Sequence, residues 1–156
     1  MKILRILGWV LLALTVVAGV AWLFRGDPLG PVSGRALRGA EVAYPSDWAV
    51  SDQHTLIALE TRPDDPHSVT TICFVHEGDL YVPAQGGSEK RWTGYVLKDP
   101  RVRLKIGDAI YPARAVRVEE ADPATFLESA GKKYPRVADA EGELPDDIWL
   151  FRIESR

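Results

Sequence analysis

The sequence predicts a mainly β domain, an antiparallel barrel or sheet with one or two helices packed outside it. Three observations support this fold class: six segments rich in β-branched or alternating apolar residues, short turns between them, and only two helix signals in the domain. The six expected strands cover residues 55–61, 68–76, 79–83, 101–106, 109–118 and 148–153.

The first three expected strands form a meander. Residues 55–61 and 68–76 are rich in β-branched and apolar side chains, and a Pro-Asp-Asp-Pro sequence typical of a turn separates them. Glu77 and Gly78 then turn the chain into the strand at 79–83. Because these connections are short, neighbouring segments of the chain are expected to pair with each other in the sheet.

A short helix at 91–98 precedes a hairpin formed by the next two strands. Pro100 forces Asp99 out of helical geometry, and this sets the end of the helix. Basic and apolar side chains then alternate from residue 101 to 106, with the two-residue period of a half-buried strand. Gly107 and Asp108 supply the tight turn into the second strand of the hairpin.

Two prolines mark the rest of the domain. Pro112 cannot donate a ladder hydrogen bond, so the strand at 109–118 should lie at a sheet edge or carry a bulge there. Asp122 and Pro123 are an N-cap and first-turn pair, and they predict a helix that ends at about Lys133. The segment 148–153 is expected to be the last, largely buried strand.

The N-terminus predicts a membrane anchor. Residues 6–24 are uncharged and apolar, and as a helix they would be about 28 Å long, close to the hydrocarbon thickness of a bilayer. Lys2 and Arg5 precede this run, so we expect a single-pass protein with a cytoplasmic N-terminus and an extracytoplasmic, periplasmic domain. A cleaved signal peptide with its small-residue site at 19–21 is the alternative, and the length of the apolar run favours the retained anchor.

The chain is therefore expected to have three parts: a transmembrane anchor at 1–25, a tether rich in glycine and proline at 26–40, and one domain at 41–156. From residue 26 onward there are 22 acidic and 16 basic residues, a net charge of −6. A mildly acidic domain is a poor candidate for binding nucleic acid.

The patterns of cysteine, histidine and serine do not support the common chemistries that need protein groups alone. Cys73, the single cysteine, lies inside an expected strand and is expected to be a buried packing residue. His54, His67 and His76 are scattered without a metal-ligand spacing, so no metal site is expected. No serine lies in the glycine-flanked sharp turn typical of a hydrolase, and no catalytic residue is assigned.

Three stretches carry a family resemblance: GDLYVPA at 78–84, GGSEKRW at 86–92 and LKDPRV at 97–102. Their order resembles the flavin-binding split-barrel superfamily, which includes pyridoxamine-phosphate-oxidase-like proteins and deazaflavin-dependent nitroreductases, with the nitroreductase branch the nearer match. The resemblance covers about residues 52–120. It implies a six-stranded antiparallel split barrel that forms a homodimer and holds FMN or a deazaflavin in a groove at the subunit interface.

The resemblance also implies which residues would contact the ring system of such a cofactor. His67, Ser68 and Thr70 would lie on the strand beneath the rings, and Gln85 and Ser88 would lie near their polar edge. Any redox chemistry would belong to the cofactor, whereas the protein groups would position it.

The phosphate of the cofactor would be bound next to these residues. By the same resemblance, Lys90 and Arg91 would meet the phosphate, and Trp92 would pack against the ligand or the partner subunit. Cations and hydroxyl groups are the donors that a phosphate needs.

One departure from the family pattern leaves a second functional hypothesis open. The basic phosphate turn of the nitroreductase branch is replaced here by an Arg-Pro-Asp-Asp-Pro sequence at 62–66, which places Asp64 and Asp65 where cations would be wanted. The first hypothesis is a flavin- or deazaflavin-dependent oxidoreductase with an unassigned small-molecule substrate. The alternative is a non-catalytic binding or assembly module on the same fold that has lost its cofactor.

Overall fold

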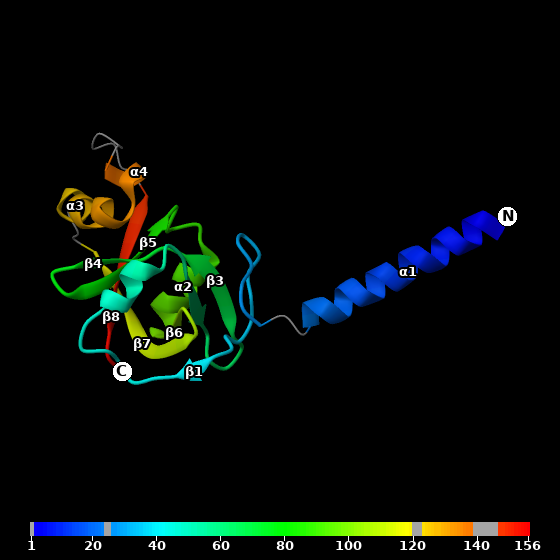
Figure 1. Cartoon of the computed structure of the whole chain (residues 1–156), viewed down its shortest axis with the longest axis horizontal. Coiled ribbons are helices and arrows are strands. Elements are labelled where there is room, and N and C mark those ends of the chain that lie inside the picture. The colour runs from blue at the N-terminus through cyan, green and yellow to red at the C-terminus, as the bar shows by residue number, and fades with distance from the viewer. Residues whose placement is uncertain (1, 24–25, 120–122, 139–146) are drawn as a thin grey trace.

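Eight strands form one curled sheet that makes up most of the domain. The structure is a computed structural model that describes residues 2–23, 26–119, 123–138 and 147–156. The strand order is β3-β2-β6-β7-β8-β5-β4, every pair on this path is antiparallel, and the short β1 pairs with β7 in parallel (Figure 1). The strands are β1 Ala40–Glu41, β2 Ile57–Thr61, β3 His67–Thr71, β4 Phe74–His76, β5 Asp79–Gln85, β6 Arg101–Ile106, β7 Ala109–Val118 and β8 Ile148–Glu154.

Helices surround this sheet. The helix α2 (Arg91–Lys98) follows β5, while α3 (Pro123–Lys133) and α4 (Pro135–Ala138) lie together at the end of the sheet that carries β4 and β5 (Figure 1). A 3-10 helix, η1, covers Ala49–Gln53. The mainly antiparallel β fold with external helices is the predicted fold class, and α2 and both strands of the β6–β7 hairpin have the predicted bounds.

The structure has more strands than the six that were expected, for two reasons. The predicted strand at 68–76 is divided into β3 and β4 by Ile72 and Cys73. At this point the chain passes from one end of the sheet to the other, since β3 pairs with β2 at one end of the strand order and β4 pairs with β5 at the other. The second addition is β1, whose two residues pair with Ala109 and Ile110 on β7.

Pro112 lies at a local edge, as predicted. It faces Arg103 of β6, while on the other side of β7 the pairing with β1 ends at Ile110 and the pairing with β8 begins at Arg114. The carbonyl of Ile110 accepts from Val42 N–H on that other side. The backbone N–H and C=O groups of alternate residues along a strand face the same side, so the backbone nitrogen of Pro112 faces this side too. The missing N–H of Pro112 therefore falls in the gap between two partners and removes no ladder bond.

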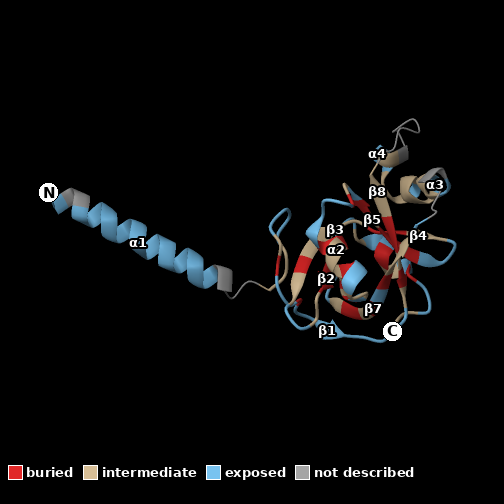
Figure 2. Ribbon diagram, turned by 180° about the vertical axis from the view of Figure 1, so that it is seen from behind, coloured by how far each residue is buried: buried red, intermediate tan, exposed pale blue. Residues whose placement is uncertain are grey.

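The interior of the curled sheet is the hydrophobic core (Figure 2). Leu59, Leu80, Leu104 and Phe151 are fully buried there, and burial of each such side chain stabilises the fold by roughly 1.5–3 kcal/mol. A second cluster lies on the outer side of β4, β5 and β8, where Phe74, Tyr81 and Leu150 pack against residues of α3. This second cluster attaches the C-terminal helices to the sheet.

The segment before β1 is packed on the sheet. Asp27 pairs with Lys105 at 2.5 Å, and Leu37 N–H donates to the carboxylate of Glu60 at 2.6 Å. Glu60 is buried on β2 and also pairs with Arg103 at 3.0 Å. These contacts hold residues 26–39 across β2 and β6.

The N-terminal helix α1 covers Lys2–Leu23 and extends away from the domain (Figure 1). Within the residues that the structure describes, no helix has both the length and the apolar character needed to cross a membrane. This finding overturns the predicted transmembrane anchor and, with it, the predicted single-pass membrane localisation. The helix includes Lys2 and Arg5, and Phe24, which the predicted run included, lies outside the described residues.

Candidate functional site

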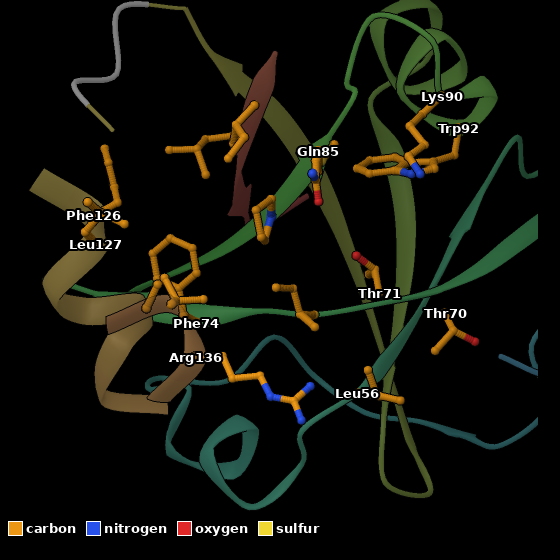
Figure 3. Close-up of a pocket in the computed structure, with 17 residues that line it drawn as sticks. Leu56, Thr70, Thr71, Phe74, Gln85, Lys90, Trp92, Phe126, Leu127 and Arg136 are labelled. Carbon is orange, nitrogen blue, oxygen red and sulfur yellow. The ribbon is translucent and has the colours of Figure 1, made fainter. Parts of the chain in front are cut away.

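A cavity of about 500 Å³ lies between the outer face of the sheet and the C-terminal helices (Figure 3). Its size is within the range of roughly 300–1,000 Å³ that is usual for small-molecule sites. The lining residues come from the β3–β4 region, the end of β5, the start of α2, and α3, α4 and β8. They are Leu56, Thr70, Thr71, Ile72, Phe74, Pro83, Ala84, Gln85, Lys90, Trp92, Phe126, Leu127, Ala130, Arg136, Val137, Ile148 and Leu150.

Most of the cavity wall is apolar. Phe74 and Phe126 lie at one side, where their rings make an edge-to-face contact with centroids 6.2 Å apart. Gln85, Lys90 and Trp92 lie together at another side, and Thr71 directs its hydroxyl toward the open space (Figure 3). A flat apolar body with a few polar or anionic groups is therefore the kind of ligand that this lining suits.

Lys90 is positioned by the loop between β5 and α2. Gly86 has a φ of +64°, a left-handed conformation that glycine adopts readily, and its carbonyl accepts from Lys90 N–H at 3.2 Å. The buried hydroxyl of Thr93 donates to the carbonyls of Gly87 and Lys90, at 2.7 and 2.6 Å. The backbone of Lys90 is thus fixed, and its ammonium has no acceptor among the described residues.

Four of the eight residues that the resemblance implied line this cavity: Thr70, Gln85, Lys90 and Trp92. Trp92 is only 6% exposed because its ring also packs on Phe151 in the core, with centroids 5.1 Å apart. The hydroxyl of Thr70 points away from the cavity in Figure 3, since Thr70 and Thr71 are neighbours on a strand and face opposite sides.

His67 and Ser68 do not line the cavity, although they belong to the same strand as Thr70. His67 makes an edge-to-face contact with Tyr95 of α2, with ring centroids 5.5 Å apart. Ser68 is fully buried, and its backbone pairs with Gly34 of the N-terminal segment through bonds of 2.7 and 3.2 Å. A Cβ at position 34 would collide with the Ser68 hydroxyl, so Ser68 is covered by that segment.

Ser88 and Arg91 are also outside the cavity lining. Both are exposed. The Ser88 hydroxyl donates to the carboxylate of Asp147 at 2.5 Å, and its N–H donates to the same oxygen at 3.1 Å. These two hydrogen bonds hold the pKa of Asp147 below its usual range. Ser88 therefore attaches the loop to the start of β8, whereas the described contacts give Arg91 no role in the cavity.

Sequence reasoning missed the part of the site that α3 and α4 supply. Arg136 lies on α4, and Figure 3 shows its side chain reaching into the space on the side opposite Lys90. The sequence contains no local signal for the position of Arg136, because neither Pro135 nor a helix of four residues predicts where this segment packs on the domain.

Two adjacent side chains dock the junction of α3 and α4. The Tyr134 hydroxyl donates to the carbonyls of Thr55 and Cys73, at 2.8 and 3.0 Å, and accepts from Cys73 N–H at 3.3 Å. Burial raises the pKa of Tyr134 to about 12. Lys133 donates from Nζ to the Ser51 carbonyl at 2.7 Å and contacts Cys73 Sγ at 3.4 Å. The Cys73 thiol is buried, and burial raises its pKa.

The charge of the lining is positive. Lys90 and Arg136 are its only ionisable groups among the described residues, and no described carboxylate, histidine or thiol lines the cavity. Asp64 and Asp65, which the sequence placed near a phosphate, lie elsewhere: Asp65 pairs with Arg62, and Asp64 lies 3.7 Å from Arg101. The donor set of Lys90, Gln85 and Thr71 therefore fits an anionic group beside a flat apolar body.

Comparisons with known proteins agree on the fold. No protein-family model matches this sequence, and no curated protein sequence matches it. A pyridoxamine 5′-phosphate oxidase-like protein from Listeria innocua superposes with a TM-score of 0.51 at 23% identity, over 67% of this chain and 86% of its own.

Two further solved structures give similar values. An F420-H2 dependent reductase matches with a TM-score of 0.50 at 20% identity, over 65% of this chain and 95% of its own. A protein described as a domain-swapped dimer matches with a TM-score of 0.51 at 19% identity, over 65% and 81% of the two chains. The chain therefore has the fold of these solved structures, which is the split barrel that its sequence predicts.

Proposed function

We propose that this protein binds FMN or a deazaflavin in the cavity between the sheet and the C-terminal helices. The observation that carries the proposal is the cavity itself: in a split-barrel fold, an apolar space of about 500 Å³ has a cation and an amide together at one side and the hydroxyl of Thr71 in its wall. The bound group would supply hydride or electron transfer, and the protein would act as an oxidoreductase on a small molecule.

The residues of this chain would bind and orient the cofactor. Lys90 would meet the phosphate, with its position fixed by Gly86 and Thr93. Gln85 and Thr71 would hydrogen-bond the polar edge of the ring system, and the apolar wall around Phe74 would exclude water from it.

Comparing two ligands tests the placement of Lys90. FMN and riboflavin differ by the phosphate alone, so we expect the wild type to bind FMN about tenfold to a hundredfold more tightly than riboflavin, as a charge-assisted contact allows. The substitution Lys90→Gln should remove this preference and leave riboflavin affinity nearly unchanged. Flavin fluorescence during titration measures both affinities.

A matched control is available on the same helix. Lys98 is exposed in the last turn of α2 and does not line the cavity, so Lys98→Gln should keep the preference for FMN. The same titrations with a 5-deazaflavin decide between the two cofactor classes. A wild-type protein that takes up neither FMN nor a 5-deazaflavin would refute the proposed function.

The proposal includes a homodimer. The match to a protein described as a domain-swapped dimer supports it, and the family resemblance implies a ligand groove at the subunit interface. Light scattering coupled to size-exclusion chromatography should give twice the 17.3 kDa mass of the chain. A mass that stays at one chain across the concentration range, with cofactor bound, would contradict this part of the proposal.

A non-catalytic binding module is the second candidate. It is favoured by the described lining, which holds no carboxylate, histidine or thiol and whose two ionisable groups, Lys90 and Arg136, are both cations suited to binding anions. In this case the cavity would bind an apolar anion and no redox reaction would follow. Bound flavin that is reduced and reoxidised with turnover of a second substrate would exclude this candidate.

A further inference from the structure

Arg136 gives the cavity a second anion-binding position, separate from Lys90. Its side chain enters from α4 and points toward the side of the cavity where Leu56 and Thr71 lie, whereas Lys90 enters from the opposite side (Figure 3). The guanidinium of Arg136 has no acceptor among the described residues. Two cations on opposite sides of one cavity can hold two anionic groups at the same time.

The position of Arg136 is fixed by the docked junction that precedes it. Val137 N–H donates to the Tyr134 carbonyl at 2.8 Å, and Tyr134 N–H donates to the Ala130 carbonyl at 2.8 Å. Because the Tyr134 hydroxyl is bound to the backbone at Thr55 and Cys73, the first turn of α4 cannot slide along the sheet. Arg136 is therefore presented to the cavity by a short helix whose start is anchored.

The surroundings of Arg136 favour a carboxylate on an apolar body. The nearest walls come from apolar side chains, among them Phe74, Leu127 and Val137, and contain no described acid. A guanidinium is a planar fork that binds a carboxylate through two parallel hydrogen bonds, which gives geometric specificity even though Arg136 itself is exposed. The adjacent apolar wall would bind the rest of such a molecule.

We propose that the α4 side of the cavity is the substrate subsite and that it takes a small aromatic or aliphatic carboxylate, with Arg136 as the residue that recognises the carboxylate. This inference rests on the proposed function, in which the cofactor phosphate is bound by Lys90 at the other side. Lys90 then selects the cofactor and Arg136 selects the substrate.

Paired probes test the subsite without any cofactor. The probes are 2-naphthoate and its neutral isostere 2-naphthamide, and isothermal titration calorimetry of the full chain measures both affinities. We expect the wild type to prefer the carboxylate by about tenfold or more, because a hydrogen-bonded charge pair is lost with the amide. Arg136→Gln should abolish this preference while 2-naphthamide affinity stays within about twofold. Arg114→Gln, at an exposed arginine of β7 outside the cavity, is the matched control and should keep the preference.

Titrations with FMN and riboflavin on the same variants separate this inference from the proposed function. Arg136→Gln should retain the preference for FMN over riboflavin, and Lys90→Gln should retain the preference for 2-naphthoate. The inference is overturned if neither naphthalene probe binds, if Arg136→Gln keeps the carboxylate preference, or if Lys90→Gln removes it. A protein that binds 2-naphthoate through Arg136 but no flavin or deazaflavin would retain the anion subsite and refute the proposed function.

Discussion

Replacing Tyr134 by phenylalanine removes one oxygen atom from the junction of α3 and α4, and we expect the free energy of unfolding to fall by about 1–3 kcal/mol. The hydroxyl makes three contacts with backbone groups of Thr55 and Cys73, at 2.8, 3.0 and 3.3 Å. Water can replace the hydroxyl at the Thr55 carbonyl, which is exposed. The Cys73 N–H is less accessible, and leaving it without an acceptor accounts for most of the expected loss.

The matched control is Tyr95→Phe on α2. The Tyr95 ring contacts His67 and lies 4.6 Å from the Arg62 guanidinium, but its hydroxyl has no hydrogen bond to a described residue. This substitution should change stability by less than about 0.5 kcal/mol. Urea unfolding measured by tryptophan fluorescence compares the two variants. An equal loss of stability in both would refute the conclusion that the Tyr134 hydroxyl holds the junction.

The raised pKa of Tyr134 adds a pH dependence with a definite sign. Between its unfolded pKa of 10.0 and its folded pKa of about 12, the native state keeps the hydroxyl proton and the unfolded state loses it. The contribution of Tyr134 is thus complete below pH 10 and is lost as the pH rises toward 12. The wild type should lose stability more steeply than Tyr134→Phe over this interval, and parallel pH profiles would contradict the prediction.

Three further predictions concern other contacts. Gly87→Ala places a Cβ against the Trp149 ring and should destabilise the fold by about 1–3 kcal/mol in urea unfolding, whereas Gly94→Ala, in open space on α2, should stabilise it by about 0.5–1 kcal/mol. Equal changes in unfolding free energy for the two variants would show that the Trp149 ring moves aside to accommodate the added Cβ. Glu60→Ala leaves the Arg103 guanidinium and the Leu37 N–H without their buried acceptor and should lower the free energy of unfolding by about 3–5 kcal/mol. The control Glu128→Ala removes an exposed ion pair and should lower it by about 0.5 kcal/mol or less. A small loss of stability for Glu60→Ala would mean that water replaces the carboxylate. Cys73 should react with a thiol reagent at pH 8 only after urea unfolding, because its side chain is fully buried and its pKa is raised, and rapid labelling of the native protein would disprove this.

The elements that the sequence predicted correctly are those with local signals at their ends. Pro100 stops α2, and Gly107 with Asp108 turns the β6–β7 hairpin, so each boundary depends on a few neighbouring residues. The short β1 has no such signal, since its partner on β7 is about 70 residues further along the chain. The break at Ile72 and Cys73 likewise depends on how the whole sheet closes.

The residues of the candidate site likewise divide into those placed by local sequence and those placed by long-range packing. Gln85, Lys90 and Trp92 follow one another along a strand, a loop and a helix start, so the family resemblance could place them together. His67 and Ser68 were expected beside them, but the N-terminal segment and Tyr95 cover that part of β3. Arg136 could not be foreseen, because its place depends on the docking of Tyr134 against Cys73, in the linker between β3 and β4 and 61 residues earlier in the chain.

The strand order has a mechanical consequence for this protein. β3 and β4 are the two outermost strands of the sheet, and they are joined only by the dipeptide Ile72–Cys73. Widening the seam between them breaks no bond of any β-ladder, since the two strands do not pair with each other. Ile72 lines the cavity directly at this seam. Separation of the two strands at Ile72 would open the cavity wall at no cost in ladder hydrogen bonds, and the contacts between the Tyr134 hydroxyl and the backbone of Cys73 are the ones that hold this seam closed.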